Sequence, residues 1–209
     1  MIYPNKQNNE MRKAINRIKY RCNKLVSNDN LRKDIVIIID IQEKKCNHIK
    51  NKFTKYGFSF VTEHLKTGDY SFYYQGDDFS DRFSIERKNS IEELIGSMLS
   101  SRFEREIRRS KLIDYYDFRN KKTKVNNDFY FEIMTEKGTL VDILNGNHSI
   151  NVDSQRMYEM IQSRKTEYNL IFNFIEDKNF SADWILSTIK YYIKNKIRNE
   201  LAIKEKIFC

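Results

Sequence analysis

The sequence has few of the features on which several classes of protein depend. Its only cysteines are Cys22, Cys46 and Cys209, which are far apart and lack the Cys-x-x-Cys spacing of a zinc or redox site. We therefore expect free thiols. The longest aliphatic run, residues 35–39, is too short to span a bilayer, which argues against a membrane protein. The N-terminus lacks an apolar segment of the signal-peptide kind, so we expect a cytoplasmic protein, or a nuclear one if the source is eukaryotic.

Histidine is also scarce, and the remaining composition is that of a folded chain. His48, His64 and His148 are isolated, and a lone histidine is more often a surface or core residue than a ligand. The 209 residues are 40% hydrophobic and 13% aromatic, which predicts a packed core rather than disorder. We find no internal repeat and no low-complexity segment.

The net charge of +9 is concentrated at the two ends of the chain. Residues 1–33 hold nine basic and two acidic residues, residues 186–209 hold six and two, and the interval between them is slightly acidic. A polyanion gripped by basic flanks and processed at an acidic centre would suit this distribution. An Asn-, Lys- and Ile-rich composition can also reflect the nucleotide bias of a genome, and the lysines would then serve only solubility.

Hydrophobic periodicity predicts an α/β fold with a mixed central β-sheet flanked by helices. A basic amphipathic helix over residues 9–26 and a turn-rich linker, residues 27–30, precede a fully apolar strand at 35–39. Further strands are expected at 58–62, 70–74, 83–85, 129–134 and 170–175, and helices at 47–56, after Ser90, after Thr139, after Asp153 and at 181–194. Residues 117–127 are polar and predict a loop.

The stretch from Asp69 to Glu92 carries the clearest chemical pattern. Two β-prone runs flank a polar segment and predict a hairpin, whose open end would set Asp69 near Glu86 and Lys88. Glu86 and Lys88 share one face of their strand because side chains repeat every second residue. Two carboxylates and an ammonium suit a hard divalent cation and a phosphate. The alternative is a surface hairpin with a scattered ion pair.

Neighbouring segments add polar groups and rigidity to this stretch. Asp40 and Glu43 follow the buried strand at 35–39, at the end where open α/β sheets usually hold ligands. Ser90 and Glu93 fit a capping box, with Ser90 as N-cap and Glu93 as its reciprocal acceptor. Lys88 would then lie where a strand becomes a helix, a position that holds a side chain rigidly.

Taken together, these motifs resemble the nuclease domain of the XPF family, a branch of the restriction-endonuclease-like PD-(D/E)XK superfamily. Gly68-Asp69 and Glu86-Arg87-Lys88 match the family signature in order, Asp40 and Glu43 match the acids of its earlier motif, and the helix after the lysine and Arg102-Phe103 are similar too. The resemblance covers roughly residues 35–194. Two positions depart from the pattern: Gln42 replaces an arginine, and Glu92 replaces an aspartate.

The resemblance implies a Mg²⁺-dependent DNA endonuclease of restriction-endonuclease-like fold, with Mn²⁺ able to substitute. Asp40, Asp69, Glu86 and Lys88 would be catalytic; Asp69 and Glu86 would hold the metal, helped by Asp40 and with Glu43 as an outer ligand. Arg87 would contact backbone carboxylates or DNA. Three arginines of the basic run 102–111 are candidates to bind phosphates: Arg102, Arg105 and Arg109. The alternative is that this run is a solvated helical face with Glu/Arg ion pairs.

The same resemblance implies a domain organisation and partners. We expect a basic N-terminal helix and linker over residues 1–33, a nuclease domain over 34–196 and a basic tail over 197–209, with no helicase or tandem helix-hairpin-helix domain. Dimerisation through the nuclease domain would use residues 154–168 and 181–194. Two alternatives stay open: a non-catalytic DNA-binding subunit of a nuclease complex, and an enzyme that acts on RNA.

Overall fold

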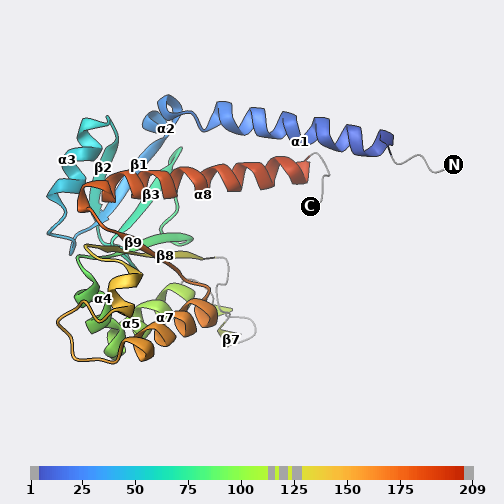
Figure 1. Ribbon diagram of the computed structural model, residues 1–209. Helices are drawn as coiled ribbons and strands as arrows, with labels where there is room; N and C mark the ends of the chain where they lie inside the picture. The colour runs from blue at the N-terminus through green and yellow to red at the C-terminus, as the bar shows by residue number, and fades with distance from the viewer. Residues whose placement is uncertain (1–4, 113–115, 118–121, 124–128, 205–209) are drawn as a thin grey trace. The chain divides into compact units, whose positions relative to one another are not determined.

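The computed structural model describes residues 5–112, 116–117, 122–123 and 129–204, and it divides the chain into two compact units (Figure 1). One unit contains residues 1–34 and 184–209, and the other contains residues 35–183. Helix α8 (Ser181–Lys204) runs without a break through both the unit boundary at residue 184 and the expected domain boundary at residue 196. No helix within the described ranges is long and apolar enough to cross a membrane.

The smaller unit pairs the N-terminal helix α1 (Asn5–Leu25) with the later part of α8. Ile18 and Cys22, from the apolar stripe of α1, are buried against Leu201 of α8, so the predicted amphipathic helix is confirmed. The predicted linker at 27–30 is wrong, because helix α2 (Asn28–Asp34) begins there. The Ser27 hydroxyl accepts a hydrogen bond from the Asn30 N–H at 3.4 Å. Serine and asparagine are as common at helix starts as in turns.

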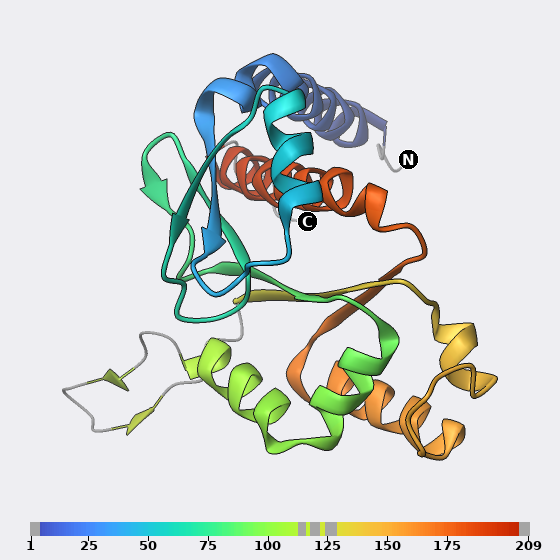
Figure 2. The ribbon, with the colours of Figure 1, turned by 90° about the vertical axis from the view of Figure 1, so that its left-hand side faces the viewer.

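The larger unit is built on a mixed sheet, which confirms the predicted α/β class (Figure 2). Its strands lie in the order β2-β1-β3-β5-β8-β9, with β4 added beside β3. β1 is parallel to β2 and antiparallel to β3, β3 is antiparallel to β5, and β5, β8 and β9 run parallel. The strands are β1 (Ile35–Asp40), β2 (Ser59–Glu63), β3 (Tyr70–Tyr74), β4 (Asp77–Asp78), β5 (Phe83–Lys88), β8 (Tyr130–Glu136) and β9 (Ile171–Ile175).

The apolar run at 35–39 forms the central strand that its composition predicted. Ile37, Ile38 and Ile39 are all buried, because β1 has a neighbouring strand on each edge and is covered on both faces. A strand of this kind fixes the position of the residues that follow it, beginning with Asp40.

Helices cover the sheet and complete the core. Figures 1 and 2 show α4, α5 and α7 together on one side of β8 and β9, where they bury a cluster that includes Leu94, Phe103 and Ile161. The predicted helix at 47–56 is confirmed as α3, and Gly57 ends it with a φ of 73°. The remaining bounds are α3 (Asn47–Lys55), α4 (Ile91–Leu99), α5 (Ser101–Leu112), α6 (Leu140–Leu144), α7 (Ser154–Tyr168) and the 3₁₀ turn η1 (Lys178–Phe180).

The segment between α5 and β8 is described only in part. A separate two-stranded ladder pairs β6 (Tyr116–Asp117) with β7 (Lys122–Thr123). The rest of the predicted polar loop at 117–127 lies outside the described residues.

Candidate active site

A glycine turn sets Asp69 against the end of β5. Gly68 has a φ of 72°, and a Cβ atom there would lie 1.9 Å from the Ser84 hydroxyl oxygen. A larger residue would therefore force the turn or the Ser84 side chain to move. The Asp69 N–H donates to the Ile85 carbonyl at 2.9 Å, beside the pairing of Tyr70 with Ile85. The predicted approach of Asp69 to the end of β5 is therefore present, although β4 takes up part of the expected hairpin by pairing with β3.

Asp69, Glu86 and Lys88 converge on one cavity. Lys88 Nζ donates to Glu86 Oε1 at 2.6 Å, as their shared strand face predicts. The Asp69 carboxylate accepts the Arg87 backbone N–H at 2.7 Å. The cavity measures about 480 Å³ and is lined by Asp40, Gln42, Glu43, Lys44, Lys45, His64, Leu65, Lys66, Thr67, Gly68, Asp69, Glu86, Arg87, Lys88, Asn89, Glu93, Arg102, Glu106 and Arg109.

The two acids at the centre of the cavity are hard to ionise together. Burial raises the pKa of Asp69 well above its usual range, and the charge of Glu86 raises it further, although the hydrogen bond from Arg87 opposes this. Burial also raises the pKa of Glu86, and Lys88 opposes the shift. Burial alone would lower the pKa of Lys88, but its carboxylate neighbours outweigh burial and the pKa is raised. Lys88 is therefore an ammonium, and a further cation would stabilise the carboxylates.

Asp40 and Glu43 reach the same cavity but are engaged elsewhere. The Asp40 N–H donates to the Asp69 carbonyl at 2.8 Å, so the two residues are neighbours across the sheet. Asp40 Oδ1, however, accepts the Leu65 N–H at 3.3 Å, and Glu43 Oε1 binds Arg87 Nη1 at 3.1 Å. Within the described ranges, no three His, Cys, Asp or Glu side chains are already arranged to hold a metal. The ligand roles of these acids stay predictions.

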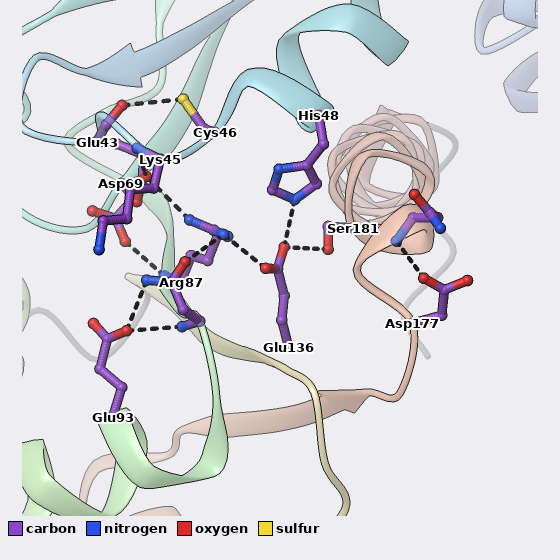
Figure 3. Close-up of polar contacts among 12 residues, drawn as sticks. Glu43, Lys45, Cys46, His48, Asp69, Arg87, Glu93, Glu136, Asp177 and Ser181 are labelled. Carbon is purple, nitrogen blue, oxygen red and sulfur yellow. Dashed lines mark hydrogen bonds and ion pairs between the residues drawn. The ribbon is translucent and has the colours of Figure 1, made fainter.

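Arg87 lines the cavity, and its guanidinium group belongs to a buried polar network (Figure 3). Its side chain is 2% exposed, and Nη2 donates to Glu136 Oε2 at 2.7 Å. The other oxygen of Glu136 accepts hydrogen bonds from Ser181 and from His48 Nε2, the latter at 3.0 Å. Burial alone would raise the pKa of Glu136, but these partners outweigh it and lower the pKa. The geometry gives Arg87 contacts to carboxylates, one of its two predicted roles, and a contact to DNA stays a prediction.

The start of α4 fixes the end of β5, with one difference from the predicted capping box. The Ser90 hydroxyl accepts the Glu93 N–H at 3.4 Å, as predicted. The Glu93 carboxylate, however, accepts the backbone N–H of Asn89 at 3.0 Å rather than that of Ser90 (Figure 3). Glu93 thus binds the residue next to Lys88 and contributes to the rigidity that the capping box was expected to supply.

The basic residues of α5 divide between the cavity and other surfaces. Arg102 and Arg109 line the cavity, whereas Arg105 is exposed and lies outside it. Arg102 Nε donates to Glu106 Oε1 at 2.8 Å. The phosphate-binding roles of all three arginines stay predictions.

Four charged residues of the cavity were not predicted: Lys44, Lys45, Lys66 and Glu106. The lysines directly follow Glu43 or precede the Gly68-Asp69 turn, so their adjacency to the motifs was a usable signal. Glu106 gave no such signal, because its spacing from Arg102 on a helix is also that of an ordinary surface ion pair.

Comparison with models of known protein families finds one family that matches this chain. The family model described as "ERCC4 domain" matches residues 39–188, which is most of the sequence and contains the whole cavity. The chain belongs to the ERCC4 domain family. The resemblance to XPF nucleases is thereby confirmed.

Solved structures show that this ERCC4 domain shares a fold with XPF from Aeropyrum pernix. XPF from Aeropyrum pernix matches with a TM-score of 0.54 at 15% identity, over 76% of this chain and 65% of that one. The structure of XPF from Aeropyrum pernix in complex with DNA matches with a TM-score of 0.53 at 17% identity, over 77% and 66%. The chain therefore spans slightly less than two thirds of these proteins, and the likeness is one of fold. A search of curated proteins by sequence finds no match.

Proposed function

We propose that the protein is a metal-dependent DNA endonuclease that hydrolyses phosphodiester bonds, with branched and flap structures among its substrates. The observation that carries the proposal is the convergence of Asp69, Glu86 and Lys88 on one cavity in a domain of the ERCC4 family. Two carboxylates and an ammonium, one from the turn before β3 and two from β5, are groups that can carry out such a reaction.

The donor set fits Mg²⁺, and Mn²⁺ would substitute for it. Asp69 and Glu86 would hold the ion, with Asp40 as a third carboxylate beside them, because hard cations prefer oxygen ligands. Burial raises the pKa of Asp69 and of Glu86, and a bound cation would oppose that shift by favouring their charged forms. When bound, the ion would polarise the scissile phosphate and lower the pKa of a water molecule.

The residues of the chain would orient the reacting groups. Lys88 is an ammonium held within 2.6 Å of a predicted metal ligand, so it can position the attacking water or neutralise charge that develops on the phosphate. Glu43 contributes indirectly, because its carboxylate holds Arg87, the residue between Glu86 and Lys88.

DNA as the substrate is supported by charge and by the similarity of fold. Arg102, Arg109 and the lysines at 44, 45 and 66 place cations around the acidic centre, which suits a phosphate backbone. One of the similar XPF structures is a complex with DNA. Charge alone does not separate DNA from RNA, so RNA belongs in the test.

A non-catalytic DNA-binding subunit is the second candidate. It is favoured by one observation: within the described ranges, the acids do not form a ready three-ligand metal site. The presence of both acids and of the lysine favours the enzyme.

The test is to incubate the purified protein with labelled flap, fork, duplex and single-stranded DNA and with RNA, in Mg²⁺ or in EDTA. We expect cleavage of DNA only in Mg²⁺. Retained binding without cleavage of any nucleic acid would favour the subunit, and cleavage of RNA alone would favour the RNA enzyme.

Two further expectations accompany the proposal. We propose that the protein dimerises through residues 154–168 and 181–194, and light scattering at several concentrations would show whether it does. A cytoplasmic location, or a nuclear one in a eukaryote, also stays a prediction.

A further inference from the structure

The Lys88 ammonium lies between two carboxylates and is closer to one of them than to the other. Its ammonium donates to Glu86 Oε1 at 2.6 Å and lies 3.8 Å from Glu106 Oε2 on helix α5. The Lys88 side chain is only 3% exposed, so water cannot replace either partner freely. The ammonium is therefore hydrogen-bonded to one acid and close to a second.

Glu106 presents an oxygen that is free to accept. Its Oε1 accepts a hydrogen bond from Arg102 Nε at 2.8 Å, which fixes the orientation of the carboxylate. Its Oε2 is buried and, within the part of the chain that the structure describes, accepts no hydrogen bond. A buried carboxylate oxygen without a hydrogen bond is costly, and the nearest ammonium is that of Lys88.

A divalent cation at Asp69 and Glu86, which the proposed function requires, would compete with this arrangement. The cation needs the oxygens of Glu86, and Lys88 already uses one of them. Two cations on one carboxylate oxygen repel each other strongly in a buried site. A cation that takes both oxygens of Glu86 would therefore leave the Lys88 ammonium in need of another acceptor.

We propose that Glu106 is a positioning residue that receives the Lys88 ammonium when a divalent cation occupies Glu86. The inference rests on the proposed function and adds a residue to its machinery. A small shift of Nζ from Glu86 towards Glu106 frees Glu86 for the cation and keeps the ammonium inside the cavity. Arg102 holds the receiving carboxylate in place during this shift.

A double-mutant cycle on cation affinity tests the proposal without any cleavage assay. Mn²⁺ binding, measured by electron paramagnetic resonance in the absence of DNA, is compared among wild type, Glu106→Ala, Lys88→Met and the double variant. Glu106→Ala should weaken Mn²⁺ binding about tenfold, the equivalent of one charge-assisted hydrogen bond. In the Lys88→Met background the same change should have an effect below about twofold, because there is no ammonium left to receive.

A matched control lies on the same helix. Glu104 also belongs to α5, but its carboxylate pairs with Arg164 at 2.6 Å and it does not line the cavity. Glu104→Ala removes the same charge and should leave Mn²⁺ affinity unchanged. An effect of Glu106→Ala that persists in the Lys88→Met background would overturn the proposal, since it would make Glu106 a direct ligand or a source of general attraction.

The inference and the proposed function fail in different ways. If wild type binds Mn²⁺ and Glu106→Ala binds it equally well, only the role of Glu106 is overturned. If wild type binds no Mn²⁺ with or without DNA, the proposed function is overturned as well.

A second measurement covers the case in which Lys88→Met does not fold. In a crystal structure of the wild type with Mn²⁺, Lys88 Nζ should lie within hydrogen-bonding distance of Glu106 Oε2 and away from Glu86 Oε1. A metal-bound structure in which Nζ remains on Glu86 Oε1 would contradict the proposal.

Discussion

Among single residues, Asp69 is a buried carboxyl group whose surroundings disfavour its charged form. Burial and the neighbouring Glu86 raise its pKa, so in the metal-free protein the folded state holds a proton on this carboxyl more tightly than the unfolded state does. The stability that this proton supplies is present below the unfolded pKa and is lost as the pH rises through the folded pKa. Metal binding would offset the loss.

Asp69→Asn should therefore stabilise the metal-free protein at pH 8, by roughly 1 kcal/mol or about 2–4 °C in Tm. An asparagine oxygen can still accept the Arg87 N–H, so the turn is preserved. The gain should shrink at pH 5, where wild-type Asp69 is protonated more often. Thermal unfolding in EDTA at both pH values measures it.

Adding Mg²⁺ provides the control for that change. The cation should raise the Tm of wild type and leave that of Asp69→Asn unchanged, because a ligand stabilises only the protein that binds it. If the variant is less stable than wild type at both pH values, the charge of Asp69 does not destabilise the metal-free fold.

At the scale of helices and strands, features that depend on neighbouring residues were easier to predict from the sequence than features that depend on contacts between distant segments. The apolar run of β1, the Gly57 end of α3 and the Ser90 cap of α4 were predictable because each depends on neighbouring residues. The start of α2 and the partner of Glu93 were missed, because Ser and Asn suit turns and caps equally.

The candidate site was predictable to the same degree. The convergence of Asp69, Glu86 and Lys88 followed from strand periodicity and a glycine turn. The place of Glu106 depends on how α5 packs beside β5, which no pattern within either segment specifies.

Gly68 allows a test of the turn that positions Asp69. Gly68→Ala should destabilise the fold by more than about 2 kcal/mol, because a Cβ would collide with the Ser84 hydroxyl and the φ of 72° is unfavourable for alanine. Chemical denaturation measures the loss.

Gly76 is the matched control, because it has a positive φ without a close contact at the Cβ position. Its φ is 87°, but a Cβ there meets no atom within 4 Å, so Gly76→Ala should cost only about 1 kcal/mol of backbone strain. Equal losses for the two variants would mean that the close contact with Ser84 does not constrain the turn.

Across the whole molecule, the net charge of +9 conceals a local pattern. In the larger unit, cations surround an acidic cavity, with Arg109 on its lining and Arg105 on the same helix outside it. The sequence showed a basic run but not which of its arginines face the cavity, since this depends on the rotation of α5. Charge that faces the cavity should matter most for DNA.

Arg109→Ala should weaken DNA binding and reduce the slope of log K against log salt by about 1, as for one lost phosphate contact. Arg105→Ala should change both quantities less. Fluorescence anisotropy at several salt concentrations, with EDTA to prevent cleavage, measures both. A larger effect at Arg105 would place the DNA on another surface of α5.

The central claim is that Lys88 acts in the hydrolysis of a phosphodiester bond, and single-turnover cleavage of labelled DNA in Mg²⁺ tests it most directly. Lys88→Ala should cut the cleavage rate by about a hundredfold or more, the usual effect of removing a group that stabilises the transition state. Its fold, checked by circular dichroism, and its DNA affinity should stay close to those of wild type. Cleavage by Lys88→Ala at the wild-type rate would contradict the account.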